Sequence, residues 1–184
     1  RNQHPLVALY GLPLPLPARL PGAGSGDIGA TLNWSNIATT DTTDRSSYTL
    51  DGEVFEVRVQ AGHALGERFA VQGQLAWRQL SGGSLDSLVE SWHDLFNLPN
   101  GSRDRLPEDA LLIEYRSGES TLLRVDDDSS GLADLPLAFG YQLAASNQGA
   151  VAAWLTIKVP TGKAADLTGS GAADVALDRR VAAP

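Results

Sequence analysis

The sequence predicts an all-β fold: an antiparallel up-and-down transmembrane β-barrel, whole, partial or shared between chains, with one short helix in a long loop. Three observations predict it: strands long enough to cross a bilayer, connections that alternate between short and long, and charge concentrated in one connection. No run in the 184 residues approaches the 18 or so apolar residues of a membrane-spanning helix. That limit does not apply to spanning strands.

The clearest strands lie between residues 135 and 159, LPLAFGYQLAASNQGAVAAWLTIKV. On both sides of the connection 146–149, apolar side chains alternate with small or weakly polar ones, which is typical of antiparallel strands joined by a tight turn. Each run has about the 9–11 residues that a tilted strand needs to cross a bilayer, whereas a soluble strand usually has about 5–6. This hairpin therefore has membrane-spanning length.

The remaining elements follow from the same alternation and from helical spacing. Polar residues 39–47 predict a loop, and the apolar repeat from Leu85 to Phe96 predicts a helix with Ser84 as its N-cap. We expect further strands at about 28–35, 48–61, 69–78 and from 173, a small hairpin formed by 111–117 and 121–127, and a Gly-rich loop over 160–172. Tyr48, Trp77, Tyr141 and Trp154 are candidates for interfacial aromatic girdles.

Residues 1–26 are expected to form a Pro-rich leader before a barrel domain at 27–184. The leader holds five of the ten prolines, and Pro fits neither a helix interior nor a central strand. It either tucks beneath or inside the domain or forms a partly ordered tail. Because the chain contains no Met, we expect Arg1 to follow a removed export signal or a cut in the chain.

Charge is concentrated in the long connection 81–132. This segment contains eleven Asp or Glu and four Arg, a balance of −7 out of a total of −8. We expect the first, third and fifth connections to be long and the others tight, as in outer-membrane barrels. A charge on the lipid face costs roughly 2–4 kcal/mol at the midplane, so an acidic outer loop keeps charge out of hydrocarbon.

A polar stripe lies opposite the apolar side chains of two predicted strands. Its members are Glu56, Arg58, Gln60, Gln72, Gln74 and Arg78. In a barrel this face lines the lumen, whereas in an ordinary antiparallel sheet it faces solvent. We favour the lumen.

The sequence offers little covalent chemistry. Ser91, His93 and Asp94 supply the residue types of a hydrolase triad, but on one helix they point in diverging directions. We predict no enzyme and no catalytic residue. Instead, Trp92, His93 and Phe96 are expected to form a loop plug that caps or constricts the outer mouth, with Trp92 buried under the helix.

No metal, cofactor or nucleic-acid partner is expected. Cys is absent, which excludes disulfides, thiolate metal sites and a thiol nucleophile. His4, His63 and His93 are too scattered for a metal site. Asp126–Asp128 could offer oxygens to Ca²⁺ or Mg²⁺, but we prefer a solvated turn. The Gly-rich run 167–171 lacks the Lys of a phosphate loop, and the acidic pI near 4.7 argues against nucleic acid.

Four segments carry a resemblance to known sequences: NQHPLVALYGLP, SWHDLFNLPNGSRDRLPED, SSGLADLPLAFGYQL and IKVPTGKAADLTGSGAADVAL. Through them the chain resembles a family of uncharacterised Gram-negative outer-membrane proteins, a domain of unknown function. The last two segments are also similar to wider groups of outer-membrane barrels, including those linked to uptake of hydrophobic compounds. The resemblance implies a membrane barrel without an established activity, and it carries over no catalytic residue.

The end of the chain departs from this pattern. Family sequences continue into further strands, and about six long strands are fewer than the roughly eight of the smallest single-chain barrels. An open sheet edge in lipid is untenable. We therefore expect a fragment, a barrel shared by two chains, or closure through the small hairpin.

Together these observations predict an outer-membrane protein with a passive channel or transport role, or a structural role in the envelope. The expected partners are outer-membrane lipid and lipopolysaccharide, a small hydrophobic solute, and a second copy of the chain or missing C-terminal strands. The main alternative is a soluble all-β module that binds an apolar ligand. An envelope hydrolase using the His93 region is a distant third.

Overall fold

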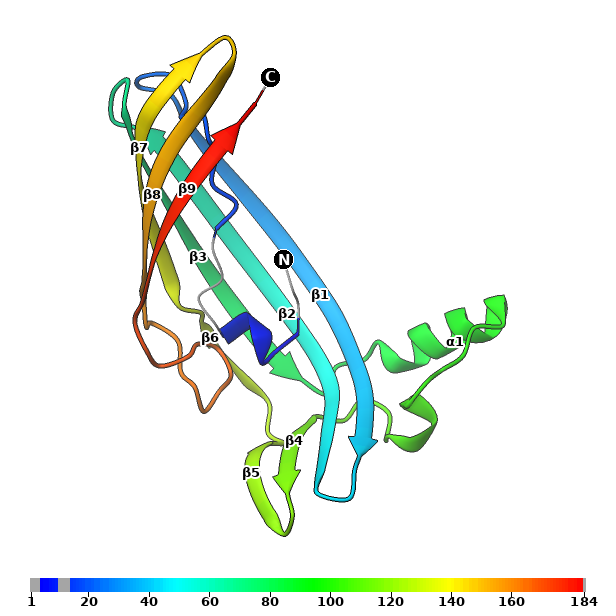
Figure 1. Cartoon of the computed structure of the whole chain (residues 1–184). Coiled ribbons are helices and arrows are strands. Elements are labelled where there is room, and N and C mark those ends of the chain that lie inside the picture. Colours follow the sequence, from blue (N-terminus) through cyan, green and yellow to red (C-terminus); the bar gives the residue numbers. More distant parts are fainter. Residues whose placement is uncertain (1–3, 10–13, 184) are drawn as a thin grey trace.

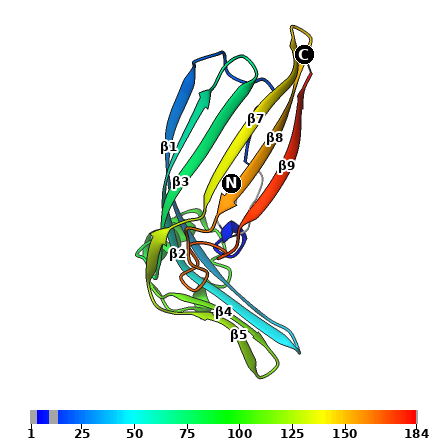
Figure 2. The same cartoon turned by 90° about the vertical axis from the view of Figure 1, so that its left-hand side faces the viewer.

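One antiparallel sheet, curled into a half-barrel, makes up most of the molecule (Figure 1, Figure 2). The structure is a computed structural model, and it describes residues 4–9 and 14–183. Its long strands lie side by side in the order β1–β2–β3–β7–β8–β9. Their bounds are Gly26–Thr42 (β1), Ser46–Ala64 (β2), Phe69–Ser81 (β3), Leu135–Ser146 (β7), Gly149–Val159 (β8) and Asp174–Ala182 (β9). The predicted antiparallel all-β fold is confirmed.

Shorter elements extend one end of this sheet. Strand β4 pairs with the first part of β2, β5 pairs with β4, and β6 pairs with the end of β3. The bounds are Val7–Leu9 (η1), Asp86–Phe96 (α1), Arg103–Arg105 (η2), Leu112–Ser117 (β4), Ser120–Val125 (β5) and Ser129–Leu132 (β6). The predicted small hairpin and single short α-helix are therefore confirmed. Within the described ranges, no helix has the length and apolar character needed to cross a bilayer.

The strand register assigns the side chains to two faces. Glu56 lies opposite Arg78, Gln72 opposite Ala138, and Ala138 opposite Thr156. Since directly paired residues point to the same side of a sheet, the even-numbered residues of β2, β3, β8 and β9 share one face, as do those of β7 up to its bulge near Gln142. This is the concave face, and the odd-numbered residues of these strands form the convex face. In β1 the assignment is reversed, because Trp34 lies opposite Phe55, so its even-numbered residues are on the convex face.

The sheet stays open in the part of the chain that the structure describes. Strand β1 pairs only with β2, and β9 pairs only with β8. The β4–β5 hairpin continues the sheet beside β2 and does not reach from β1 to β9. Closure through the small hairpin is therefore wrong, because its pairing with β2 places it on the β3 side of that strand.

The first connection is shorter than predicted. Residues 39–47 were expected to form a loop, but they belong mostly to β1 and β2, and only residues 43–45 turn the chain. Thr is β-branched and suits a strand, and Thr40 Oγ1 lies 3.2 Å from Thr49 Oγ1 across the hairpin. The prediction of a long first connection is wrong because polar Thr residues here build strands.

The long connections β3–β7 and β8–β9 nevertheless gather at one end of the sheet, which we call the loop end (Figure 1). The tight turns β2–β3 and β7–β8 lie at the other end, which we call the turn end. The Gly-rich segment 160–173 forms no helix or strand, as predicted.

The described part of the leader lies inside the concave face. Leu14, Leu16 and Leu20 are buried there against three strands, so the leader is tucked into the domain and is not a loose tail. Two buried clusters result: Leu14, Leu16, Leu20, Ala70, Ala138, Ala152 and Trp154 in the middle, and Leu50, Val54, Leu80, Leu111, Ile113 and Leu167 toward the loop end.

Candidate functional site in the concave face

Specific hydrogen bonds hold the leader against the concave face. The amide of Gln142 takes part in two of them: its Oε1 accepts from the Leu20 backbone N–H at 2.7 Å, and its Nε2 donates to the Ala18 carbonyl at 3.0 Å. Arg180 donates to the Leu14 carbonyl at 3.0 Å. Because Pro-rich backbone has few donors of its own, the sheet's side chains supply the partners that order it.

Trp154 forms the floor beneath the leader. Its indole N–H donates to the Pro17 carbonyl at 2.8 Å, and the side chain is only 2% exposed. The ring lies directly over Gly140, where a Cβ atom would come within 2.7 Å of it. Trp154 therefore packs inside the curled sheet, and its assignment to an interfacial girdle is wrong because even-numbered residues of β8 face the interior.

A buried ion cluster lies on the concave face of β2 and β3. Glu56 is 2% exposed and contacts both Arg58 and Arg78, the second at 2.7 Å. Arg78 also donates to the Leu167 carbonyl at 3.3 Å, which fastens the inward-folded β8–β9 loop. A single carboxylate thus serves two buried guanidinium groups.

The predicted polar stripe does share one face of the sheet. Gln60 lies opposite Gln74, and Gly62 opposite Gln72, in the same register that pairs Glu56 with Arg78. All six side chains therefore point to the concave side, where they are buried or half-buried. Whether this side is a lumen stays a prediction.

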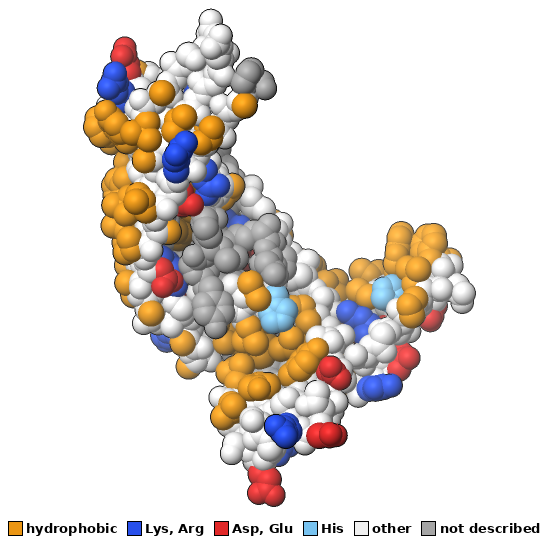
Figure 3. All heavy atoms as spheres, in the orientation of Figure 1, with side chains coloured by type: hydrophobic (Ala, Val, Ile, Leu, Met, Phe, Trp, Pro, Cys, Tyr) orange, Lys and Arg blue, Asp and Glu red, His pale blue; other side chains and the backbone are white. Residues whose placement is uncertain are grey.

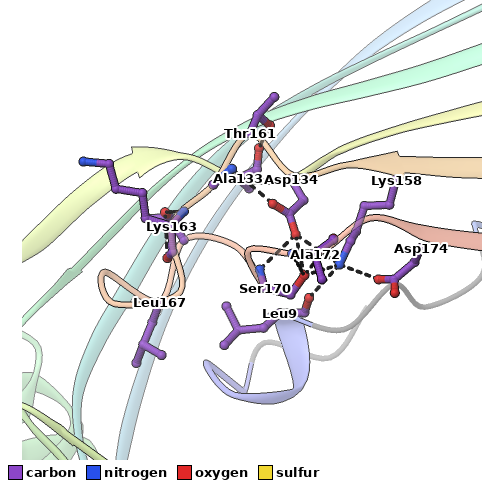
Figure 4. A network of polar contacts seen from close by, with 12 residues as sticks. Leu9, Ala133, Asp134, Lys158, Thr161, Lys163, Leu167, Ser170, Ala172 and Asp174 are labelled. Carbon is purple, nitrogen blue, oxygen red and sulfur yellow. Dashed lines mark hydrogen bonds and ion pairs between the residues drawn. The ribbon is translucent and has the colours of Figure 1, made fainter.

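A second polar network closes the loop end of the concave face (Figure 4). Lys158 Nζ lies 3.1 Å from Asp134 Oδ2, 2.5 Å from Asp174 Oδ2 and 2.5 Å from Ser170 Oγ. It also donates to the Leu9 carbonyl of the leader at 3.4 Å. Burial alone would raise the pKa of Asp134, but hydrogen bonds from Ser170 and from Lys158 outweigh it and lower that pKa.

The convex face is apolar and exposed. Ile28 on β1 is 78% exposed and Leu177 on β9 is 80% exposed, and exposed apolar residues continue across the strands between them. These are Leu32, Val57, Val59, Leu75, Phe139, Leu155, Ile157 and Val175. Figure 3 shows hydrophobic side chains along the edge of the molecule that β7 and β8 form.

Two rows of aromatic side chains bound this face. At the loop end, Phe55 makes edge contacts with Trp34 and Trp77, with ring centroids 6.2 and 6.4 Å apart. Toward the turn end, Phe69 and Tyr141 have centroids 5.0 Å apart. Between these two rows, the register places no Asp, Glu, Lys or Arg on the convex face of the six long strands. We call this face the convex belt.

Beyond the belt, buried acidic groups hold the start of the long loop. Glu53 accepts the Trp34 indole N–H at 2.6 Å and the Ser84 backbone N–H at 2.9 Å. It occupies the space of an absent side chain at Gly83, whose φ is +80°. Leu85, and not Ser84, is the N-cap of α1, and it makes no side-chain cap. The Ser84 prediction is wrong: the helix begins one residue later, and Glu53 on β2 accepts the backbone N–H groups of Ser84 and Leu85.

Asp86 also holds the start of the long loop in place. It contacts Arg103 at 2.6 Å, accepts from Asn36 at 2.8 Å and accepts the Asp109 backbone N–H at 2.9 Å. The neighbouring Asp51 is 3% exposed. Burial, assisted by the charge of Asp86, raises the pKa of Asp51 to about 6.

We expect Asp51→Asn to stabilise the protein above pH 6 and to have little effect at pH 4. The pKa of Asp51 is about 6 in the folded chain against 3.8 ordinarily, so folding carries no charge penalty below 3.8 and loses stability as the pH rises through about 6. The variant should gain on the order of 1–3 kcal/mol at pH 8. Denaturant unfolding at the two pH values measures this. The exposed Asp126→Asn is the control, and an equal effect of Asp51→Asn at both pH values would contradict the assignment.

The predicted loop plug, Trp92, His93 and Phe96, lies on α1, and its capping of an outer mouth stays a prediction. Helix α1 projects away from the concave face (Figure 1). Trp92 is 57% exposed and its ring lies tilted against that of Phe96 with centroids 4.5 Å apart. Its predicted burial is therefore wrong, since the large apolar side chains of this helix (Leu88, Trp92, Leu95 and Phe96) are all more than half exposed. His93 Nδ1 lies 2.9 Å from Asn100 Oδ1, which places His93 beside Asn100 instead of in a relay with Ser91 and Asp94.

Among the described residues, no group of His, Asp or Glu is arranged to hold a metal ion.

The sequence analysis did not predict several residues of this site. Gln142, Asp134 and Lys158 bind segments more than a hundred residues away or across a loop, and only the strand register brings these partners together. For Gln142 and Lys158, alternation could have placed them on the concave face, because both are polar residues on strands with apolar odd positions.

Comparison of the chain with known proteins identifies a family but no individual relative. A family model described as a protein of unknown function (DUF3187) matches residues 1–181. The chain belongs to this family. No curated protein and no solved structure matches it. As a member of DUF3187, the chain inherits no assigned activity, so its function has to be argued from the two faces of the sheet.

Proposed function

We propose that the chain forms the wall of an outer-membrane β-barrel. The barrel provides a passive path for solutes, and the leader closes this path. The observation that carries this proposal is the division of the sheet into an exposed apolar convex belt and a polar concave face. In water, so large an exposed apolar surface is a liability. In a bilayer, it is what the outer face of a barrel requires.

The dimensions of the belt support the same assignment. Phe69 and Trp77, on one strand, mark its two aromatic rows. Eight residue steps span about 26 Å along the strand, or about 20 Å across the membrane at a tilt of roughly 40°. This covers most of the apolar band of about 25 Å in known outer-membrane barrels. Arg179, on the convex side of β9, lies level with the turn-end row, where a headgroup region would begin.

Membrane insertion requires the two free edges to be paired. Unpaired N–H and C=O groups of β1 and β9 would cost several kcal/mol each in hydrocarbon. The proposed barrel therefore includes further strands between β9 and β1, from this polypeptide or from another copy. These strands would enclose the concave face as a lumen that holds the leader.

Electrophoresis tests the proposal first. A folded barrel keeps its structure in cold SDS and shifts its migration on boiling, and the protein should need detergent to stay soluble once purified from membranes. A protein that is soluble without detergent and has one migration position would contradict the proposal.

Releasing the leader is expected to raise solute flux several-fold. The double variant Gln142→Ala/Arg180→Ala removes hydrogen bonds to Leu20, Ala18 and Leu14, each worth about 1 kcal/mol. Swelling of proteoliposomes in small sugars measures flux, and trypsin cleavage after the leader residue Arg19 reports its release. Arg124→Ala, at an exposed ion pair, is the control. Cleavage without added flux would favour a structural role in the envelope.

A further inference from the structure

A pocket of about 490 Å³ lies at the loop end of the concave side. Its walls come from three separate parts of the chain: residues 4–6 of the leader, the far end of the β1–β2 hairpin, and the β4–β5 hairpin. Figure 3 shows hydrophobic side chains gathered on this side of the molecule, over the base of the β4–β5 hairpin. The volume falls within the roughly 300–1,000 Å³ of small-molecule sites.

The register explains why this surface is apolar. Tyr48 pairs with Tyr115 and Leu50 with Ile113 across β2 and β4, and Tyr115 pairs with Leu123 across β5. Side chains of directly paired residues lie on the same face, so two tyrosine rings and three aliphatic side chains form one continuous lining. Leu50 and Ile113 also belong to the buried loop-end cluster, which gives the pocket a fixed floor.

The pocket lining holds one carboxylate, which is already paired, and its other titratable residues are His4, Tyr48 and Tyr115. Glu114 is the one acidic residue of its lining, and its carboxylate is already paired with Arg124 at 2.6 Å. Burying a charged ligand against the Tyr, Leu and Ile side chains of this lining would cost several kcal/mol. The rings of Tyr48 and Tyr115 can stack on an aromatic ligand, and their hydroxyl groups can bond one polar substituent.

We propose that this pocket binds a small, uncharged, largely apolar aromatic molecule. Because the pocket lies beyond the Trp34–Phe55–Trp77 row, the site does not depend on the convex belt facing lipid. The leader residue Leu6 forms part of its wall, so occupancy of the pocket and placement of the leader are physically linked.

Protection of single cysteines tests the site, since the chain has no Cys of its own. The probe is neutral 2-naphthol, and the anion 2-naphthalenesulfonate is its charged counterpart. In Leu123→Cys, which places the thiol in the lining, 2-naphthol should slow alkylation at least five-fold, while the sulfonate should slow it less than two-fold. In Leu122→Cys, on the neighbouring exposed residue, neither compound should change the rate.

Two results would overturn the inference. Equal protection of both cysteines by 2-naphthol would show nonspecific partitioning, and absence of protection at both would show that the pocket does not bind this class. A second variant, Tyr115→Asp combined with Leu123→Cys, keeps the thiol and adds a negative charge to the lining. It should abolish protection by 2-naphthol, and a retained five-fold effect would place the probe elsewhere.

Discussion

Val175→Arg is expected to destabilise the membrane-inserted protein by roughly 2–4 kcal/mol, the cost of a lipid-facing Arg near the midplane of an outer-membrane barrel. Ala176→Arg, one residue away, should cost less than about 1 kcal/mol. Val175 points outward from β9, is 70% exposed and lies level with Gly73, halfway between the two aromatic rows, whereas Ala176 points to the concave side, where it is half-buried. Urea unfolding in phospholipid vesicles measures both variants.

The same pair separates a membrane protein from a soluble one. In water, a charge at so exposed a position as Val175 should change stability by no more than about 0.5 kcal/mol. Arg at the half-buried Ala176 would then be the more damaging substitution. Reversal of the order of the two variants would therefore contradict a lipid-facing convex belt.

Glu56→Ala is expected to cost about 3–5 kcal/mol, because it leaves two buried guanidinium groups without a counter-charge. Glu56 contacts Arg58 and Arg78, and the side chains of the two arginines are 11% and 6% exposed. Denaturant unfolding measures the loss. Glu114→Ala serves as the control, since its partner Arg124 is half exposed and such pairs contribute about 0–1 kcal/mol.

A triple variant tests the physical cause of that loss. Glu56→Leu with Arg58→Met and Arg78→Met removes all three charges together, and replacement of a whole buried ion cluster by apolar side chains is often neutral or better. Most of the stability lost in Glu56→Ala should return. If Glu56→Ala instead costs less than 1 kcal/mol, water reaches these arginines and the concave face is wet.

Local periodicity predicted the sheet well and its long-range partners poorly. The alternation between Leu135 and Val159 is a strong strand signal, and it located β7 and β8 to within a residue. The Thr-rich end of the first hairpin failed because polarity was taken as evidence of a loop, whereas β-branched residues extend strands. Both outcomes depend on residues close in sequence.

The contacts made inside the curled sheet could not be predicted from local periodicity. The prolines of the leader exclude a helix, but nothing local indicates that Trp154 and Gln142 bind it. Alternation placed Glu56 and Arg78 on one face, yet their ion pair depends on a strand register that the sequence leaves open. For α1, an amphipathic pattern suggested burial of Trp92, and the described chain provides no surface to cover it.

The most direct test of the account is a nitroxide scan of β3 in lipid, one cysteine at a time from Ala70 to Trp77. A lipid-facing convex belt predicts alternation with a period of two: labels at 71, 73 and 75 collide with oxygen dissolved in the bilayer, and labels at 70, 72, 74 and 76 do not. Collisions of the odd-numbered labels with a water-soluble nickel complex would show that the apolar face meets water, and the account would be wrong.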